Sequence, residues 1–151
     1  MKRFRFPLRP VAVLRGHHEV RAREAFGAAV QRYTAAQDDV KRLALRMRAL
    51  EAELSQARAT SFRPSETVQL LADYGRECAA EAEADRRVAT ARVEMHKARL
   101  EYIEAHRQLE IVRRLEEKAR NTHRLETNRA EQSEMDELAG QQRTQPFSLS
   151  S

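Results

Sequence analysis

Few residues in the sequence have the types and spacing that catalysis or metal binding would require. His17 and His18 are adjacent, so on a helix they point in different directions and are poor joint ligands of one metal ion. The other histidines have no histidine or cysteine four residues away; they are His96, His106 and His123. Cys78 has no paired base to activate its thiol, and no glycine-rich phosphate loop occurs. We therefore expect no catalytic residues, no metal site and no cofactor.

The composition also argues against an enzyme with an enclosed pocket. Of the 151 residues, 34% are charged and 5% are aromatic, and none is Trp. Ala, Arg, Glu and Leu dominate, which is typical of long helices and coiled coils rather than of a thick globular core. The single cysteine cannot form an internal disulfide, and no stretch approaches the roughly 20 apolar residues of a membrane span. We expect a soluble cytoplasmic protein.

The positive charge is concentrated at the N-terminal end. Residues 1–23 contain seven Lys and Arg but only one acidic residue, Glu19, so this segment carries a net charge of +6. The remainder contains 21 basic and 22 acidic residues and is nearly neutral. Such an end is attracted to an acidic protein surface, a nucleic acid or an anionic membrane, and the charge alone does not distinguish among them.

The prolines divide the chain into two long helical runs. Pro7 and Pro10 lie near the start, Pro64 lies near the middle, and Pro146 lies in the tail. Proline breaks helix interiors, so we predict helices over about 11–58 and 66–140, joined by a loop at 59–65. Ser65 is a plausible N-cap and Gly140 is expected to close the second helix. Residues 1–140 would then form a single domain, with a disordered tail at 141–151.

Both runs carry an apolar seam of the coiled-coil type, in which residues alternate in steps of four and three. In the first run the seam comprises Ala22, Phe26, Ala29, Tyr33, Ala36, Val40, Leu43, Met47, Leu50, Leu54 and Ala57. In the second it comprises Leu70, Tyr74, Glu77, Glu81, Ala84, Val88, Ala91, Met95, Ala98, Tyr102, Ala105, Leu109 and Val112. A short connection makes the helices antiparallel neighbours. The predicted fold is all-α: a two-helix antiparallel coiled-coil hairpin with a longer, overhanging second helix.

The two seams fit each other in one register. Facing residues have numbers that add up to 124, so that Leu54 meets Leu70 and Ala36 meets Val88, and large side chains repeatedly face small ones. The same register centres the turn on residue 62, inside the expected loop. Two carboxylates, Glu77 and Glu81, interrupt the seam. They indicate either a loose, solvated stretch or a face offered to another protein.

The seam ends at Val112, so we expect residues 113–140 to project beyond the first helix as an overhang. The basic N-terminal segment with Phe4 and Phe6 would lie beside the root of this overhang. Exposed apolar residues together with concentrated charge are typical of an interaction site. One face of the overhang also carries a mostly polar stripe that could dock on another protein; its members are Leu125, Asn128, Gln132, Met135 and Ala139.

Both ends of the chain carry distinctive motifs. The N-terminal one is Phe4-Arg5-Phe6-Pro7-Leu8, with Val11, Leu14 and Arg15. The C-terminal one is Asn128-Arg129, followed by Gln132 and by Met135-Asp136-Glu137-Leu138-Ala139. With the length and the two-helix layout, these motifs resemble the FliJ family of bacterial flagellar export proteins.

The resemblance implies a non-enzymatic cytoplasmic stalk of the flagellar type III export apparatus, similar in architecture to the central stalk of rotary ATPases. Such a stalk binds in the centre of the hexameric export ATPase, promotes assembly of the ring and links it to the cytoplasmic domain of the export gate. It also associates with export chaperones. The resemblance places the protein peripherally at the cytoplasmic face of the inner membrane, held there by the export apparatus.

The expected contact residues follow from where the family-like motifs lie. Contacts with the ATPase are placed at the end that carries both motifs; they are Phe4, Phe6, Leu8, Arg15, Asn128, Arg129, Met135 and Asp136. Contacts with the export gate are placed on the second helix at Leu71, Tyr74 and Cys78.

The sequence is also compatible with other functions. The equivalent stalk of a virulence type III secretion system is poorly separated from the flagellar one by sequence. A coiled coil that binds nucleic acid through residues 2–23 is a second alternative, although no nucleic acid is expected as a partner, because no zinc, basic-zipper or RNA-stacking motif accompanies the basic arm. A self-associating structural coiled coil is the third, and the register, which satisfies the seam within one chain, argues against it.

Overall fold

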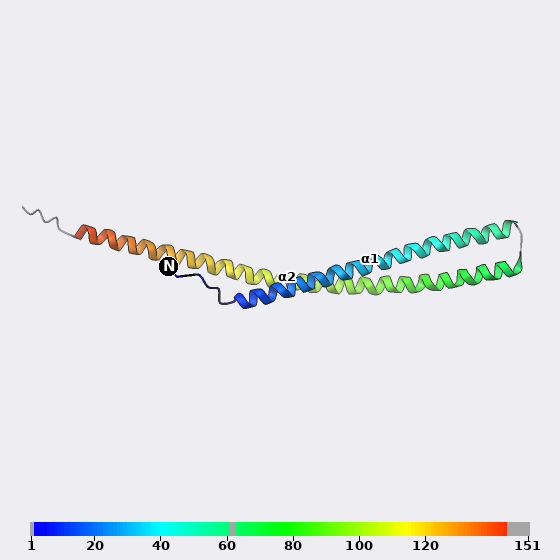
Figure 1. Ribbon diagram of the computed structural model, residues 1–151, viewed down its shortest axis with the longest axis horizontal. Coiled ribbons are helices and arrows are strands. Elements are labelled where there is room, and N and C mark those ends of the chain that lie inside the picture. Colours follow the sequence, from blue (N-terminus) through cyan, green and yellow to red (C-terminus); the bar gives the residue numbers. More distant parts are fainter. Residues whose placement is uncertain (1, 61–62, 145–151) are drawn as a thin grey trace, which may run out of the picture. The chain divides into compact units, whose positions relative to one another are not determined.

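The computed structural model describes residues 2–60 and 63–144, and these form two long helices and no strand. Helix α1 spans Arg9–Thr60 and helix α2 spans Pro64–Thr144 (Figure 1). The predicted all-α fold with two antiparallel helices, the second longer than the first, is confirmed. The chain divides into two compact units, which we call the hairpin unit, Glu19–Ala105, and the terminal unit, Met1–His18 with His106–Ser151.

In the hairpin unit, the two helices pack along the predicted seam. Every predicted seam residue of this unit is buried or half-buried. The most buried are three alanines, Ala29 with 1%, Ala84 with 4% and Ala91 with 9% of the residue exposed. Small side chains let the two backbones approach closely, so each alanine is covered by the larger residues of the facing helix.

Side-chain contacts between the helices of the hairpin unit lie close to the predicted register. The rings of Phe26 and Tyr102 stack with their centroids 6.1 Å apart and their planes inclined by 8°. The predicted register places Ala98 opposite Phe26 and Ala22 opposite Tyr102. These small side chains leave the space that the two stacked rings occupy. Farther along, Arg32 Nε lies 3.9 Å from Glu94 Oε2, and the Tyr74 hydroxyl donates a hydrogen bond of 3.2 Å to Glu51 Oε1.

Helix α1 begins at Arg9 rather than at residue 11, with Pro10 in its first turn, where the missing N–H costs nothing.

The loop between the helices is shorter than predicted. Helix α1 continues to Thr60, whose hydroxyl donates to the carbonyl of Gln56 at 2.8 Å. Helix α2 begins at Pro64, so Ser65 is a helical residue and not the N-cap. The predicted centre of the turn, residue 62, lies outside the described residues.

The prediction that Gly140 ends the second helix was wrong. A glycine ends a helix efficiently by adopting a positive φ, and Gly140 does not adopt one. Helix α2 runs on through Gln141 to Thr144, whose hydroxyl donates to the carbonyls of Gly140 and Gln141 at 3.2 and 3.0 Å. The residues after Gly140 are good helix formers, so nothing in them stops the helix. Of the predicted disordered tail, residues 145–151 lie outside the described part.

Glu77 is a weak point of the hairpin unit. Its Oε2 atom is buried and has no hydrogen-bond partner among the described residues. The side chain lies beside a groove of about 330 Å³ that is also lined by Leu50 and Asp73. A buried carboxylate oxygen without a partner loses its hydration and gains nothing in return.

We expect Glu77→Leu to raise the free energy of unfolding by about 1 to 2 kcal/mol, because the substitution removes this buried oxygen and extends the apolar seam. Urea denaturation followed by circular dichroism measures the change. Glu83→Leu is the control, because Glu83 is exposed and forms ion pairs with Arg86 and Arg87. A loss of stability in Glu77→Leu would mean that the carboxylate is satisfied by water in the groove.

Candidate protein-binding site in the terminal unit

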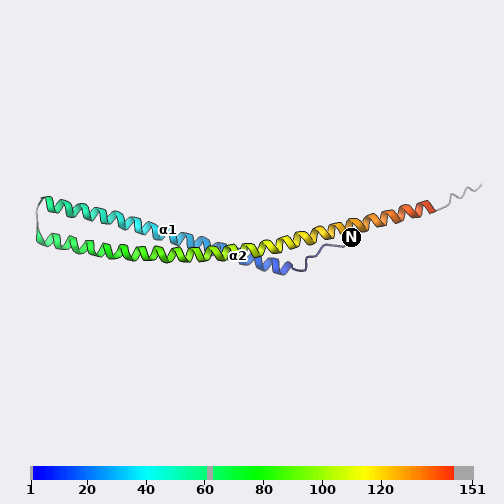
Figure 2. The same ribbon diagram turned by 180° about the vertical axis from the view of Figure 1, so that it is seen from behind.

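In the terminal unit, the N-terminal segment that precedes α1 lies along α2. Figures 1 and 2 show this segment beside the same stretch of α2 from opposite sides. The Phe4 ring meets the His123 ring edge-on, with 5.5 Å between centroids, and the Arg120 guanidinium lies 5.4 Å from the Phe4 centroid. A cation over an aromatic face is worth about 0.5–1 kcal/mol at an exposed site. Phe4 therefore anchors the segment on α2.

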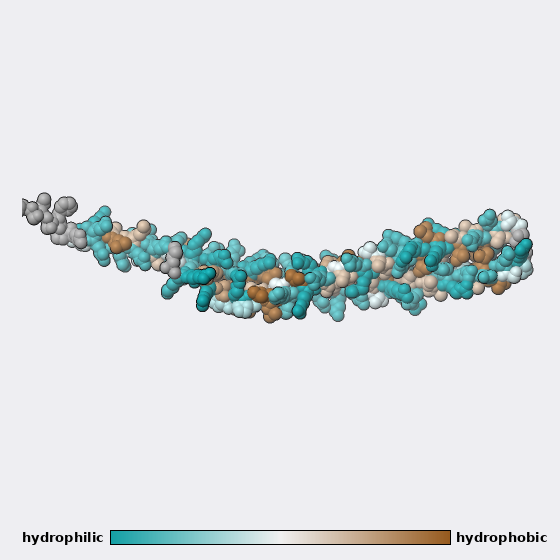
Figure 3. Space-filling view, viewed as in Figure 1, coloured by the Kyte–Doolittle hydropathy of each residue, from teal (hydrophilic) through white to brown (hydrophobic). Residues whose placement is uncertain are grey.

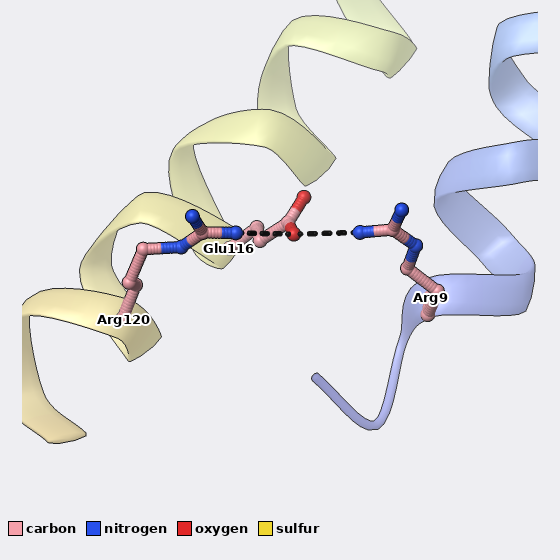
Figure 4. Close-up of polar contacts among 3 residues, drawn as sticks. All are labelled: Arg9, Glu116 and Arg120. Atoms are coloured by element: carbon pink, nitrogen blue, oxygen red, sulfur yellow. Dashed lines mark hydrogen bonds and ion pairs between the residues drawn. The ribbon is translucent and has the colours of Figure 1, made fainter. Parts of the chain in front are cut away.

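A second anchor joins the start of α1 to α2 (Figure 4). One carboxylate oxygen of Glu116 lies 3.2 Å from Arg9 Nη1 and 3.3 Å from an Arg120 guanidinium nitrogen. The Glu116 side chain is 19% exposed, so these contacts are less screened than a surface ion pair. Arg9 also donates its backbone N–H to the Phe6 carbonyl at 3.1 Å, which fixes the turn between the segment and α1.

The N-terminal segment, which the sequence places beside the root of the overhang, covers part of residues 113–140. One face of α2 is half-buried as far as Thr127, through Glu116, Ala119 and His123. An extended segment advances about 3.3 Å per residue and a helix only 1.5 Å, so a few N-terminal residues cover several turns of α2. Only residues 128–144 are exposed throughout. We call them the exposed end of α2.

Phe4→Ala should release the N-terminal segment from α2 and leave the hairpin unit intact, because it removes both the ring contact with His123 and the cation contact with Arg120. Hydrogen exchange should then become faster at the amide of Arg9, which bonds to Phe6, and unchanged around Ala84. Phe4→Leu is the matched variant that keeps most of the apolar area. An unchanged exchange rate at Arg9 in Phe4→Ala would show that the Glu116 contacts hold the segment by themselves.

The structure distributes the predicted ATPase contacts over two parts of the terminal unit. Four come from the N-terminal part; they are Phe4, Phe6 and Arg15, which are half-buried, and Leu8, which is 42% exposed. The other four lie on the exposed end of α2; they are Asn128, Arg129, Met135 and Asp136. Lys2 and Arg3 line a groove together with Asn128, so the two parts adjoin there. Met135 is 67% exposed, and Asp136 accepts a hydrogen bond of 3.2 Å from Gln132.

Of the residues predicted to contact the export gate, Leu71 is exposed and the other two are half-buried. Leu71 is 48% exposed, whereas Tyr74 is turned towards α1 by its hydrogen bond to Glu51. The electrostatic interaction with the nearby Cys78, and then the hydrogen bond to Glu51, raise the pKa of the Tyr74 hydroxyl above its ordinary value. Tyr74 therefore acts as a neutral donor between the helices at ordinary pH.

Sequence reasoning missed the anchor that Glu116 forms. Glu116 and Arg120 are four residues apart, which is the spacing of an ion pair on a helix, but nothing local indicates that Arg9 joins them from more than one hundred residues away. Within residues 2–60 and 63–144, no group of three or more His, Cys, Asp or Glu is placed to hold a metal ion. Neither α1 nor α2, as far as it is described, has an apolar stretch that could cross a membrane.

The fold defines a class of protein: a two-helix antiparallel coiled coil whose second helix continues into the exposed end of α2. The flagellar FliJ protein family matches residues 4–146, and the chain belongs to this family. Its fold is similar to the structure of a putative YscO homolog, CT670, from Chlamydia trachomatis, with a TM-score of 0.68 and 16% identity. The similarity covers 93% of this chain and 96% of that one. No curated protein matches the sequence significantly.

Proposed function

We propose that the protein is a non-enzymatic cytoplasmic stalk of the flagellar type III export apparatus. It binds in the centre of the export ATPase hexamer, promotes assembly and activity of the ring, and couples the ring to the cytoplasmic domain of the export gate and to export chaperones. These contacts hold it at the cytoplasmic face of the inner membrane. Membership of the flagellar FliJ family supports this proposal and favours the flagellar apparatus over a virulence secretion system.

The observation that carries the proposal is the exposure of every residue from 128 to 144 on α2. A single helix with its side chains is about 10–12 Å wide, so this end is the part of the terminal unit best suited to enter the narrow opening of a ring. Met135 and Leu138 are 67% and 61% exposed there. A thioether and a leucine on an otherwise polar helix provide apolar contacts for a partner, while Arg129 and Asp136 provide charged ones.

The proposed gate contact is separate from the ATPase contact. Leu71 lies on the hairpin unit and presents an exposed apolar side chain. Tyr74 and Cys78 are half-buried and form the inner part of the proposed gate contact, on the side of the seam. A stalk that uses different units for the ring and for the gate can bind both partners at once.

The proposed function is tested by adding the purified chain to the flagellar export ATPase and measuring ATP hydrolysis and ring assembly. We expect both to increase in proportion to the added chain until one chain is bound per ring. The hairpin substitution Leu71→Asp should leave this stimulation unchanged and weaken binding to the cytoplasmic domain of the gate. No stimulation and no co-migration with the ATPase would contradict the proposal, and binding of DNA that falls steeply with salt would favour the nucleic-acid alternative instead.

A further inference from the structure

Besides Val13 and Leu125, the terminal unit carries four exposed aliphatic side chains that neither the fold nor the proposed ATPase contact uses. Val11 and Leu14 lie on α1 with exposed fractions of 37% and 54%. Ile111 and Leu115 lie on α2 with exposed fractions of 46% and 45%. We call these four residues the aliphatic quartet. Residues of this kind are ordinarily buried, and a group of them at the surface marks an interaction site.

The quartet lies on one side of the helix pair. In the terminal unit, the seam continues through Ala12 and Arg15 on α1 and through Val112 and Glu116 on α2, all buried or half-buried. Each quartet residue immediately precedes one of these four positions. In an antiparallel pair, residues that precede seam positions project to the same side of both helices. Figure 3 shows hydrophobic side chains gathered where α1 begins.

The aliphatic surface continues along α2 into a groove. Leu115 and Phe4 line this groove of about 430 Å³, together with Arg5, Lys118 and Ala119. The quartet therefore extends into a trough between the N-terminal segment and α2, which has an apolar floor and cations at its rim. One carboxylate, Glu126, also lines the groove.

The charge around the quartet is strongly positive. Residues 2–18 contain five Lys and Arg and no Asp or Glu, and residues 106–124 contain six Lys and Arg and three Glu. Two of those three carboxylates already pair within the unit, Glu110 with Arg113 and Glu116 with Arg9 and Arg120. Together these two segments carry eight more positive than negative charges.

We propose that the aliphatic quartet docks an acidic amphipathic helix of a partner protein. Aliphatic residues three and four positions apart on two antiparallel helices form the floor that a third helix packs into, with its own apolar stripe facing down. Carboxylates beside that stripe meet the arginines and lysines at the rim. The proposal goes beyond the proposed function, because the quartet contains none of the residues assigned to the ATPase.

The inference is tested on the full-length protein without the ATPase, with a stapled helical peptide that carries a leucine stripe flanked by glutamates. The double variant Leu14→Glu/Ile111→Glu should lower the affinity of this peptide by at least about ten-fold. Val13→Glu is the matched control, because Val13 is 52% exposed on the same turn of α1 but follows the seam position and faces the other side. It should bind as the unaltered protein does, and Leu14→Met/Ile111→Leu should also retain binding.

Further probes separate the alternatives. A peptide with the same leucine stripe flanked by lysines should bind at least about ten-fold more weakly than the acidic one. Equal binding of the two peptides, or an equal loss in Val13→Glu, would overturn the proposal. Two further probes are vesicles of phosphatidylcholine with phosphatidylserine and a DNA duplex. The result that would contradict the proposal is that one of them binds and loses binding in Leu14→Glu/Ile111→Glu, while the acidic peptide does not bind. Either outcome would assign the surface to a membrane or to nucleic acid instead. Circular dichroism shows that each variant stays helical.

Discussion

The double variant Arg129→Glu/Met135→Asp should abolish co-migration of the protein with the flagellar export ATPase and remove its stimulation of ATP hydrolysis. Both side chains lie on the exposed end of α2, and Met135 is 67% exposed. The substitutions reverse one charge and place another at the most exposed apolar residue of this end, so they oppose the docking of any complementary surface. We expect the affinity to fall by about a hundred-fold or more, which corresponds to roughly 3 kcal/mol.

A matched control comes from the same helix. Val93→Asp introduces a charge at an equally exposed apolar position, 69% exposed, in the hairpin unit. This variant should bind and stimulate the ATPase as the unaltered protein does. Thermal unfolding of both variants should be unchanged, because neither position is buried. Retained stimulation in Arg129→Glu/Met135→Asp would show that the ATPase contacts another part of the chain.

The second substitution with a large expected effect changes the stability of the fold rather than binding. Ala29→Glu should lower the free energy of unfolding by about 3 kcal/mol or more, because Ala29 is 1% exposed in the tightest part of the seam. A glutamate there is too large for the space between the helices, and its charge would be buried without a partner. Urea denaturation measures the loss.

The neighbouring substitution Ala28→Glu is the control for helix propensity and charge. Ala28 is exposed on the same turn of α1, so we expect a change within about 0.5 kcal/mol. If the two variants lost the same stability, the seam would not be the main source of the stability of the hairpin unit. At a low temperature at which Ala29→Glu is still folded, the variant should bind the ATPase. Such binding would show that the substitution affects the stability of the fold and not the binding site.

The seam could be predicted from the sequence because it depends on a repeat of apolar residues within each helix. Residues such as Ala84 and Ala91 follow that repeat, and the antiparallel arrangement follows from the short connection between the helices. The helix ends were less predictable. Ser65 and Gly140 are favourable capping residues, but α2 includes both, since the residues around them are also compatible with a helix.

The sequence predicts that the N-terminal segment lies beside the root of the overhang, but the contacts that hold it there could not be predicted, for a different reason. The segment has no periodicity, and its contacts join Phe4 and Arg9 to residues more than one hundred positions away on α2. The motif around Phe4 indicated a special role for this end of the chain. It did not indicate that the aromatic ring would be held against His123 and Arg120 by the same molecule. Such long-range contacts depend on tertiary packing.

We propose that the exposed end of α2 enters the export ATPase ring. The most direct test of this proposal is to place a photo-crosslinking phenylalanine derivative at Met135 and, as a control, at Val93, and to identify the crosslinked protein in assembled apparatus. We expect position 135 to crosslink to residues lining the central opening of the ATPase hexamer and position 93 not to do so. Crosslinking of position 135 only to other proteins, or equally at both positions, would contradict the proposal.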